Sequence, residues 1–135
     1  MTNTIKAIKV TADGAKVVEI ENTLEALQNV VKGWIEVVPL MESNWYDVSF
    51  KDDPQCALTI VCNEEGKFQR LNPTIALGTY GAHGQPIPYD VVMGDALIMA
   101  TSGEDFASLT DEQIEAGMEW IDYWHNSNGN WRNEV

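Results

Sequence analysis

CALTIVCNEEGKFQRLNPTIAL, residues 56–77, is the stretch on which the predicted fold depends. Its first part, Cys56–Cys62, is apolar on both faces of an extended chain, which is typical of a strand in the interior of a sheet. The acidic segment Asn63–Gly66 predicts a hairpin turn in which Gly66 adopts the positive φ that a bulged turn requires. Lys67–Leu71 is then expected to return as the partner strand.

The end of this stretch carries a helix-start pattern. Pro73 is tolerated at the first helical position, and Asn72 can accept hydrogen bonds from the exposed amides, so Thr74–Leu77 is expected to form one helical turn. Residues 78–88 then read GTYGAHGQPIP, which contains too much Gly and Pro for regular structure. A glycine-rich loop of this length is often a lid or a binding loop.

Patterns on both sides of this stretch predict the remaining elements. The first helix is expected to have Asn22 as its N-cap, Glu25 in a capping box and Gly33 as a left-handed C-cap. The last helix is expected to begin at Thr110, with Gln113 completing a second capping box. The other predicted strands cover residues 5–11, 16–20, 34–40, 44–50, 90–93 and 96–100.

These elements predict an α+β fold for the whole chain. We expect a single compact domain over residues 1–135, with a mostly antiparallel or mixed sheet of about six to seven strands and two main helices. Its 135 residues, of which 44% are hydrophobic, suit one domain with its own core. Residues 126–135 are expected to form a flexible tail.

The charge and the hydropathy of the chain limit the classes of function. The net charge is -13, and no Lys or Arg lies between residues 70 and 132, which disfavours direct binding of nucleic acid. No apolar run is long enough to cross a bilayer, and the first residues lack a secretion-signal pattern. We therefore expect a cytoplasmic protein that binds neither nucleic acid nor membrane.

The cysteines and histidines do not predict a metal or catalytic site. Cys56 and Cys62 lie on one predicted strand, about 20 Å apart at ~3.3 Å per residue, which is too far for a disulfide. Further ligands at zinc-site spacing are missing, so no metal and no cofactor are predicted. His83 and His125 are far apart, and no Ser-His-Asp set or phosphate-binding glycine loop accompanies them, so we expect a protein that is not an enzyme.

The last predicted helix carries apolar residues on more than one side. A surface helix needs one apolar stripe, so Trp120, Tyr123 and Trp124 are expected to meet a further partner. That partner is either another subunit or the chain's own residues 126–135. We favour the first alternative, which predicts a homo-oligomer.

Four segments occur in order along most of the chain: NTLEALQNVVKGWIEVVPL, IVCNEEGKFQRLNPTIAL, YDVVMGDALI and GEDFASLTDEQIE. Through them the chain resembles a small family of uncharacterised proteins from phages and mobile elements of bacteria. Members tend to carry Asn-Arg-Ala-Leu after the acidic turn, where this chain has Thr74–Leu77 and so lacks that cation. The resemblance implies an accessory protein that blunts host defence, and it supplies no catalytic residues.

The first functional hypothesis is that the protein binds and sequesters a small nucleotide-like signal. Two cations beside the predicted helix start would hold its phosphate, and aromatic side chains would stack on its base. The predicted ligand-binding residues are Lys67, Arg70, Asn72, Thr74, Tyr80, His83, Trp34 and Trp45. For the cations the alternative is an ordinary exposed strand face, and for the tryptophans it is packing in the core.

The second hypothesis is an acidic inhibitor, or DNA mimic, that acts on a basic surface of a host defence protein. The residues that would carry it are Glu104, Asp105, Asp111, Glu112, Glu115, Glu119 and Asp122. The alternative for these residues is that they only cap and solvate the last helix.

Overall fold

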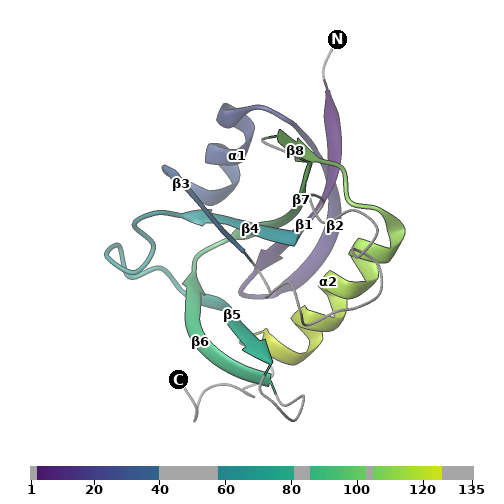
Figure 1. Cartoon of the computed structure of the whole chain (residues 1–135). Helices are drawn as coiled ribbons and strands as arrows, with labels where there is room; N and C mark the ends of the chain where they lie inside the picture. Colours follow the sequence, from purple (N-terminus) through teal and green to yellow (C-terminus); the bar gives the residue numbers. More distant parts are fainter. Residues whose placement is uncertain (1–2, 40–57, 81–85, 103–104, 126–135) are drawn as a thin grey trace.

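A computed structural model describes residues 3–39, 58–80, 86–102 and 105–125 (Figure 1). These residues form two helices and a mostly antiparallel set of strands, so the predicted α+β fold class is confirmed. The elements are β1 (Thr4–Thr11), β2 (Gly14–Glu21), α1 (Leu24–Val31), β3 (Ile35–Pro39), β4 (Leu58–Asn63), β5 (Pro73–Tyr80), β6 (Pro86–Met93), β7 (Ala96–Ser102), β8 (Asp105–Ala107) and α2 (Asp111–Trp124). The main sheet has the strand order β2-β1-β7-β4-β3, with β8 on β7, while β5 and β6 pair in a second sheet.

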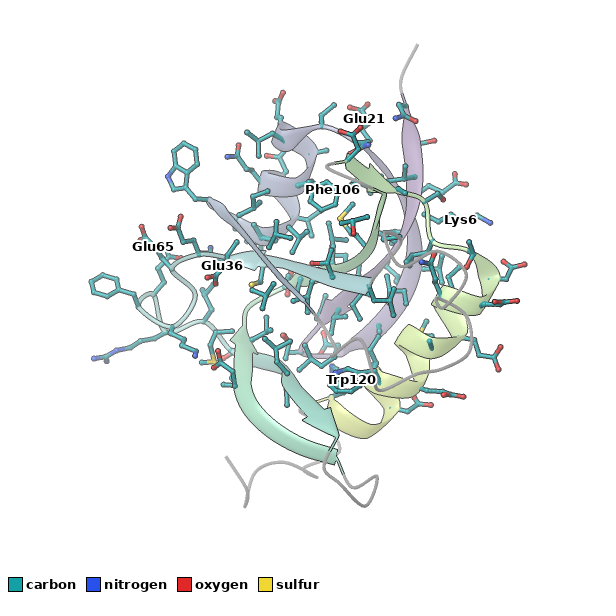
Figure 2. The ribbon with its side chains drawn as sticks, viewed as in Figure 1. Lys6, Glu21, Glu36, Glu65, Phe106 and Trp120 are labelled. Atoms are coloured by element: carbon teal, nitrogen blue, oxygen red, sulfur yellow. The ribbon has the colours of Figure 1, made fainter. Side chains whose placement is uncertain are left out.

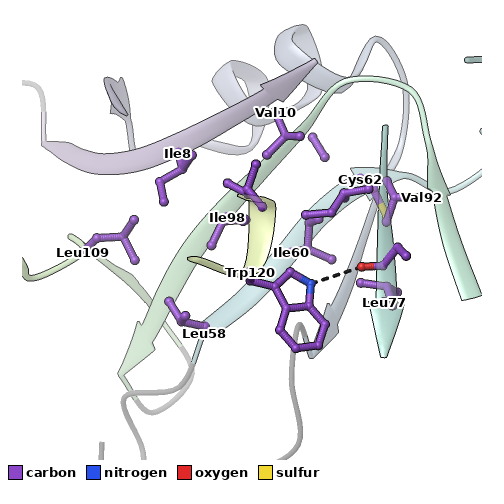
Figure 3. Packing of buried hydrophobic residues seen from close by; sticks show 14 of the residues in the cluster. Ile8, Val10, Leu58, Ile60, Cys62, Leu77, Val92, Ile98, Leu109 and Trp120 are labelled. Carbon is purple, nitrogen blue, oxygen red and sulfur yellow. Dashed lines mark hydrogen bonds between the residues drawn. The ribbon is translucent and has the colours of Figure 1, made fainter. Parts of the chain in front are cut away.

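The main sheet is covered on both faces. Successive side chains of a strand point to opposite faces of the sheet, and apolar residues lie on both. One face packs against α1 through a buried cluster of Ile5, Ala7, Leu27, Val31, Val61, Leu97 and Met99. The opposite face packs against α2 and the β5–β6 hairpin through a larger cluster that includes Ile8, Val10, Leu58, Ile60, Ile98 and Trp120 (Figure 3). The hairpin and α2 together therefore form a layer opposite α1 (Figure 1).

Strand β4 lies inside the main sheet, as its apolar sequence predicts. It pairs with β3 on one side and with β7 on the other, and all its residues are buried. Among the described strands, β3 is the last in the order, and its described part reaches Pro39, which has no N–H to donate to a ladder. That Pro39 marks a sheet edge or the end of a strand stays a prediction, because residues 40–57 lie outside the described residues.

Helix α1 forms where the sequence predicts it, but its two caps are shifted by one residue. Thr23, rather than Asn22, is the N-cap, and its hydroxyl accepts a hydrogen bond from the N–H of Ala26 at 3.2 Å. Asn22 is instead used across the fold, where its side chain donates to the carbonyl of Phe106. The left-handed C-cap is Lys32, with φ of 63°, and not Gly33.

The predicted strand Lys67–Leu71 is wrong, since residues 64–70 form a series of turns and β4 pairs with β3 and β7 instead. Asn63 holds the start of these turns: its side-chain amide donates to the carbonyl of Val31 and its side-chain oxygen accepts from the N–H of Glu65. The positive φ, 58°, occurs at Arg70 and not at Gly66.

Gly66 is nevertheless essential for a different reason. A Cβ atom at this position would lie 2.4 Å from the carbonyl oxygen of Met93, so the turn can approach the end of β6 only without a side chain. The glycine was correctly identified as a special position, but it serves a close backbone approach rather than a left-handed conformation.

The predicted helical turn Thr74–Leu77 is also wrong, because these residues belong to strand β5. All of them are buried, so extended residues with apolar contacts on both faces replace the expected helix start. The segment 78–88 is partly regular as well: β5 runs to Tyr80 and β6 begins at Pro86, with a bulge between Leu77 and Gly78. Helix-start and glycine patterns were here overridden by pairing between the two strands.

Helix α2 confirms the predicted capping box at Thr110 and Gln113, whose side chains each bond the other's backbone N–H. Its inner face carries Trp120, which is 1% exposed and donates from Nε1 to the carbonyl of Ala76 at 3.1 Å (Figure 3). His125, the residue after the helix, bonds the carbonyl of Thr11 through Nε2. The helix thus ties β5 to the β1–β2 hairpin.

Neither described helix is long and apolar enough to cross a membrane. The predicted strand over residues 44–50, Cys56 and the tail 126–135 lie outside the described residues.

Candidate binding site

A cleft of about 290 Å³ lies where the main sheet meets the β5–β6 hairpin and the turns of residues 64–70. We call it the acidic cleft. Its lining residues are Glu36, Val38, Cys62, Asn63, Glu64, Gly66, Lys67, Leu77, Asp90, Val91, Val92 and Met93. The floor is apolar and the polar side chains come from three separate parts of the chain, which only the fold brings together.

The charges of the cleft are mainly negative. Among the described lining residues, Glu36, Glu64 and Asp90 supply carboxylates and Lys67 supplies a cation. Lys67 forms an ion pair with Asp90, and the same carboxylate oxygen also accepts a hydrogen bond from the N–H of Val91 at 2.8 Å. The cation of the cleft is therefore already neutralised by a neighbour.

Cys62 is the buried thiol at the floor of the cleft. Burial raises the pKa of Cys62 to about 11, with smaller contributions in the same direction from Glu36 and Asp90, while Lys67 acts in the opposite direction. Its Sγ also lies 3.7 Å from the carbonyl oxygen of Glu36, to which it can donate. A thiol with so high a pKa stays protonated at neutral pH and is a poor nucleophile.

Two large aromatic side chains are exposed on residues linked to the turns of residues 64–70. Trp34 is 66% exposed and lines a separate hollow with Lys32 and Gly33, and its carbonyl accepts a hydrogen bond from the N–H of Glu64 at 2.9 Å. Phe68 is 87% exposed and belongs to the same turns as Glu64 and Lys67. Figure 2 shows Glu36 and Glu65 on the side of the molecule where these turns project.

The structure brings together only some of the residues predicted to bind a ligand. Lys67 lines the acidic cleft, whereas Arg70 is exposed and is not among the lining residues. Asn72 and Thr74 line a separate hollow of about 150 Å³, and Thr74 donates to the carbonyl of Gly94 at 2.9 Å. The predicted anion site at a helix start does not form, because Pro73 begins a strand.

The aromatic residues of the prediction also separate. Trp34 lines a separate hollow, Tyr80 is the last residue of β5, and Trp45 and His83 lie outside the described residues. Sequence reasoning missed Phe68, Glu36 and Asp90. Phe68 could have been found as an apolar residue between Lys67 and Gln69 in a glycine-containing turn, but no local pattern joins Glu36 to Asp90.

The predicted partner interface on α2 is occupied by the chain itself at Trp120, which packs in the core. Tyr123 and Trp124 lie in the last turn of α2. Trp120 thus finds its partner in strand β5 of the same chain, and not in another subunit.

The chemistry of the acidic cleft comes from its carboxylates and its apolar side chains. Among the described residues, no group of three or more His, Cys, Asp or Glu side chains is placed to hold a metal ion. Its carboxylates and apolar floor would accept a group that is both cationic and partly apolar, such as an Arg or Lys side chain.

Comparison with known proteins shows a family for this chain but no function. No curated protein and no solved structure matches the chain. The model of one family, described as the domain of unknown function DUF3846, matches residues 5–125, from the first residues of β1 to the end of α2. The chain therefore belongs to the DUF3846 family.

Proposed function

We propose that this protein is a non-catalytic binding protein that engages a basic surface of a partner protein through the acidic cleft and the exposed aromatic side chains of Trp34 and Phe68. One observation carries the proposal. Phe68, which is 87% exposed, belongs to the same turns as Glu64 and Lys67 of the cleft, and Trp34, which is 66% exposed, is joined to Glu64 by a backbone hydrogen bond. Large aromatic groups rarely stay this exposed without a use, because each removes roughly 150–250 Å² from water when it is buried.

The two kinds of group would divide the work of binding. Aromatic side chains, Trp above all, are over-represented among the residues whose removal costs most binding energy, so Trp34 and Phe68 would supply affinity. Glu36, Glu64 and Asp90 would select a basic partner and orient it. The net charge of -13 would speed the first encounter with such a partner.

A small nucleotide-like signal fits the acidic cleft less well. Its phosphate would face three carboxylates, and the cation available to it, Lys67, is paired with Asp90. Arg70, the second predicted cation, is not a lining residue. Sequestration of a nucleotide at this site is therefore the weaker of the two functions predicted from the sequence.

The resemblance to proteins of phages and mobile elements suggests the class of partner. Such elements gain from blocking the defences of their host, and a defence protein that binds nucleic acid presents a basic surface. We propose a host defence protein of this kind as the target.

The experiment is affinity capture with purified wild-type protein and three variants. The variants are Trp34→Ala, Phe68→Ala and Leu24→Ala, the last being a matched control because Leu24 is also exposed, at 56%, but lies at the start of α1. A captured protein identified by mass spectrometry should be lost with the first two variants and retained with the third. It should also be released by salt, since charge contributes to binding.

Two results would reject the proposal. One is capture that is equal for all the variants, which would place binding elsewhere on the surface. The other is a rise in the melting temperature of the wild-type protein with cyclic dinucleotides or ADP-ribose derivatives that is lost in the Lys67→Ala variant. This result would favour the nucleotide hypothesis.

A further inference from the structure

Two lysines face each other across the β1–β2 ladder. Lys9 is the register partner of Lys16, whereas Lys6, further along the same strand, is the partner of Glu19. Like charges directly opposite one another destabilise a pair of strands, and opposite charges stabilise it. The ladder thus follows the favourable rule at one position and breaks it at the other, in a chain that has only 8 Lys and Arg against 21 Asp and Glu.

Neither lysine is neutralised within the described part of the chain. The ion pair found there joins Lys67 to Asp90, and it involves neither Lys9 nor Lys16. Lys9 is also partly buried, which raises the cost of leaving its charge without a partner. An anionic group that contacted both ammonium groups would therefore meet two cations without a competing ion pair.

The two lysines line a hollow of about 340 Å³ at the tip of the hairpin. The other lining residues in the described part of the chain are Thr11, Asp13, Gly14 and Ala15, so among them the two ammonium groups outnumber the carboxylate of Asp13. This volume is at the lower end of the range of roughly 300–1,000 Å³ that is usual for small-molecule sites. The hollow shares no residue with the acidic cleft.

Strand alternation separates this hollow further from the acidic cleft. Ile8 and Val10 point to the face covered by α2, so Lys9 between them points to the α1 face. The acidic cleft lies on the other face, since its floor residue Cys62 belongs to the same cluster as Ile8. The molecule therefore gathers opposite charges on opposite faces of one sheet.

We propose that Lys9 and Lys16 form a binding site for a phosphate group of a small phosphorylated molecule. A phosphate that bridges the two ammonium groups would turn their mutual repulsion into two charge-assisted hydrogen bonds. This site is independent of the proposed partner-binding function, because either can fail without the other.

The test uses inorganic pyrophosphate as the probe and the backbone amide NMR signals of the full chain as the readout. Saturable shifts are expected at the residues of the β1–β2 hairpin. Lys16→Gln should weaken pyrophosphate binding by about tenfold or more, as expected for the loss of one charged hydrogen bond. The matched control is Lys6→Gln, which removes the same charge from β1 but leaves the facing lysines intact, and it should change the affinity by less than about twofold.

A second variant gives an independent readout. Lys16→Glu places opposite charges across the ladder, so it should raise the melting temperature while it abolishes the pyrophosphate response. The proposal is overturned if wild-type protein shows no saturable shift, if Lys6→Gln weakens binding as much as Lys16→Gln, or if Lys16→Glu still responds to pyrophosphate.

Discussion

The β1–β2 hairpin and the β5–β6 hairpin are held in the fold by different means. The β1–β2 hairpin has an unbroken register from Thr4 opposite Glu21 to Thr11 opposite Gly14. The β5–β6 hairpin has irregularities after Pro73 and after Leu77, and it pairs with no strand of the main sheet. The first is a continuation of the sheet, whereas the second is held in place by other parts of the chain.

The contacts that hold the second hairpin come from residues far away in the sequence. Trp120 donates to Ala76, and His125 forms an isolated β-bridge with Ile75. Gly66 lies against the backbone of Met93, and Thr74 donates to the carbonyl of Gly94. Alternation and turn residues are therefore enough to specify the β1–β2 hairpin. The β5–β6 hairpin depends instead on contacts with residues far away in the sequence.

The largest effect is expected for the anchor on α2. Trp120→Ala removes a fully buried indole and should lower the free energy of unfolding by about 3–5 kcal/mol, measured by urea denaturation. Trp120→Phe keeps most of the apolar contact but leaves the carbonyl of Ala76 without its donor, so it should cost less. Equal stability of wild-type and Trp120→Ala proteins would mean that α2 does not anchor the hairpin.

The next effect is expected at the close approach between the turns and β6. Gly66→Ala puts a methyl group within 2.4 Å of the carbonyl oxygen of Met93, so the backbone must move, at a cost of about 1–3 kcal/mol. Glu65→Ala is the matched control, because Glu65 is the exposed neighbour in the same turn. If both variants unfold at the same urea concentration, the turn can move away from β6 without penalty.

A smaller effect is expected in the locally specified half of the molecule. Thr23→Ala removes the N-cap of α1 and should destabilise the protein by about 1 kcal/mol. Asn22→Ala should cost less, because the bond from Asn22 to Phe106 is longer, at 3.3 Å, and caps no helix. If thermal denaturation showed a larger loss of stability for Asn22→Ala than for Thr23→Ala, Asn22 would be the N-cap, as the capping-box pattern predicted.

The smallest effect concerns the pH dependence of stability, and it is absent near neutral pH. The pKa of Cys62 is raised from 9.0 to about 11, so the folded protein keeps this proton at a pH where the unfolded chain loses it. The resulting stabilisation is fully present below pH 9.0 and is lost as the pH rises towards about 11. Denaturation over this range should show a shallower decline for Cys62→Ala than for wild-type protein, and parallel declines would contradict the burial of this thiol.

The sequence predicted the parts of the fold that are encoded locally. Alternation identified β1 and β2, a continuous apolar run identified β4, and hydroxyl and amide side chains identified the capping box of α2. It failed over residues 67–77, where a returning strand was expected but turns continue to Arg70, and where Asn72 and Pro73 suggested a helix start but strand β5 begins. There, burial against α2 and the main sheet decides the conformation, and no pattern within the segment reports that burial.

The candidate sites were less predictable than the fold. Lys67 lines a cleft, but its pairing with Asp90 joins residues that are far apart in the sequence. Lys9 and Lys16 were read only as strand residues, because their significance depends on the register between β1 and β2. A site assembled across strands becomes visible only once the pairing is known.

The position of the acidic cleft, between a sheet and a hairpin that share no backbone ladder, gives its occupant a mechanical role. Lys67 pairs with Asp90 on β6, so under the proposed function a guanidinium that entered the cleft would compete for the same carboxylate and would lie between the main sheet and the hairpin. Binding should therefore change the rates of amide hydrogen exchange along β5 and β6, with little change in β1 and β2. The second hairpin would act as a reporter of occupancy, and the first as its internal reference.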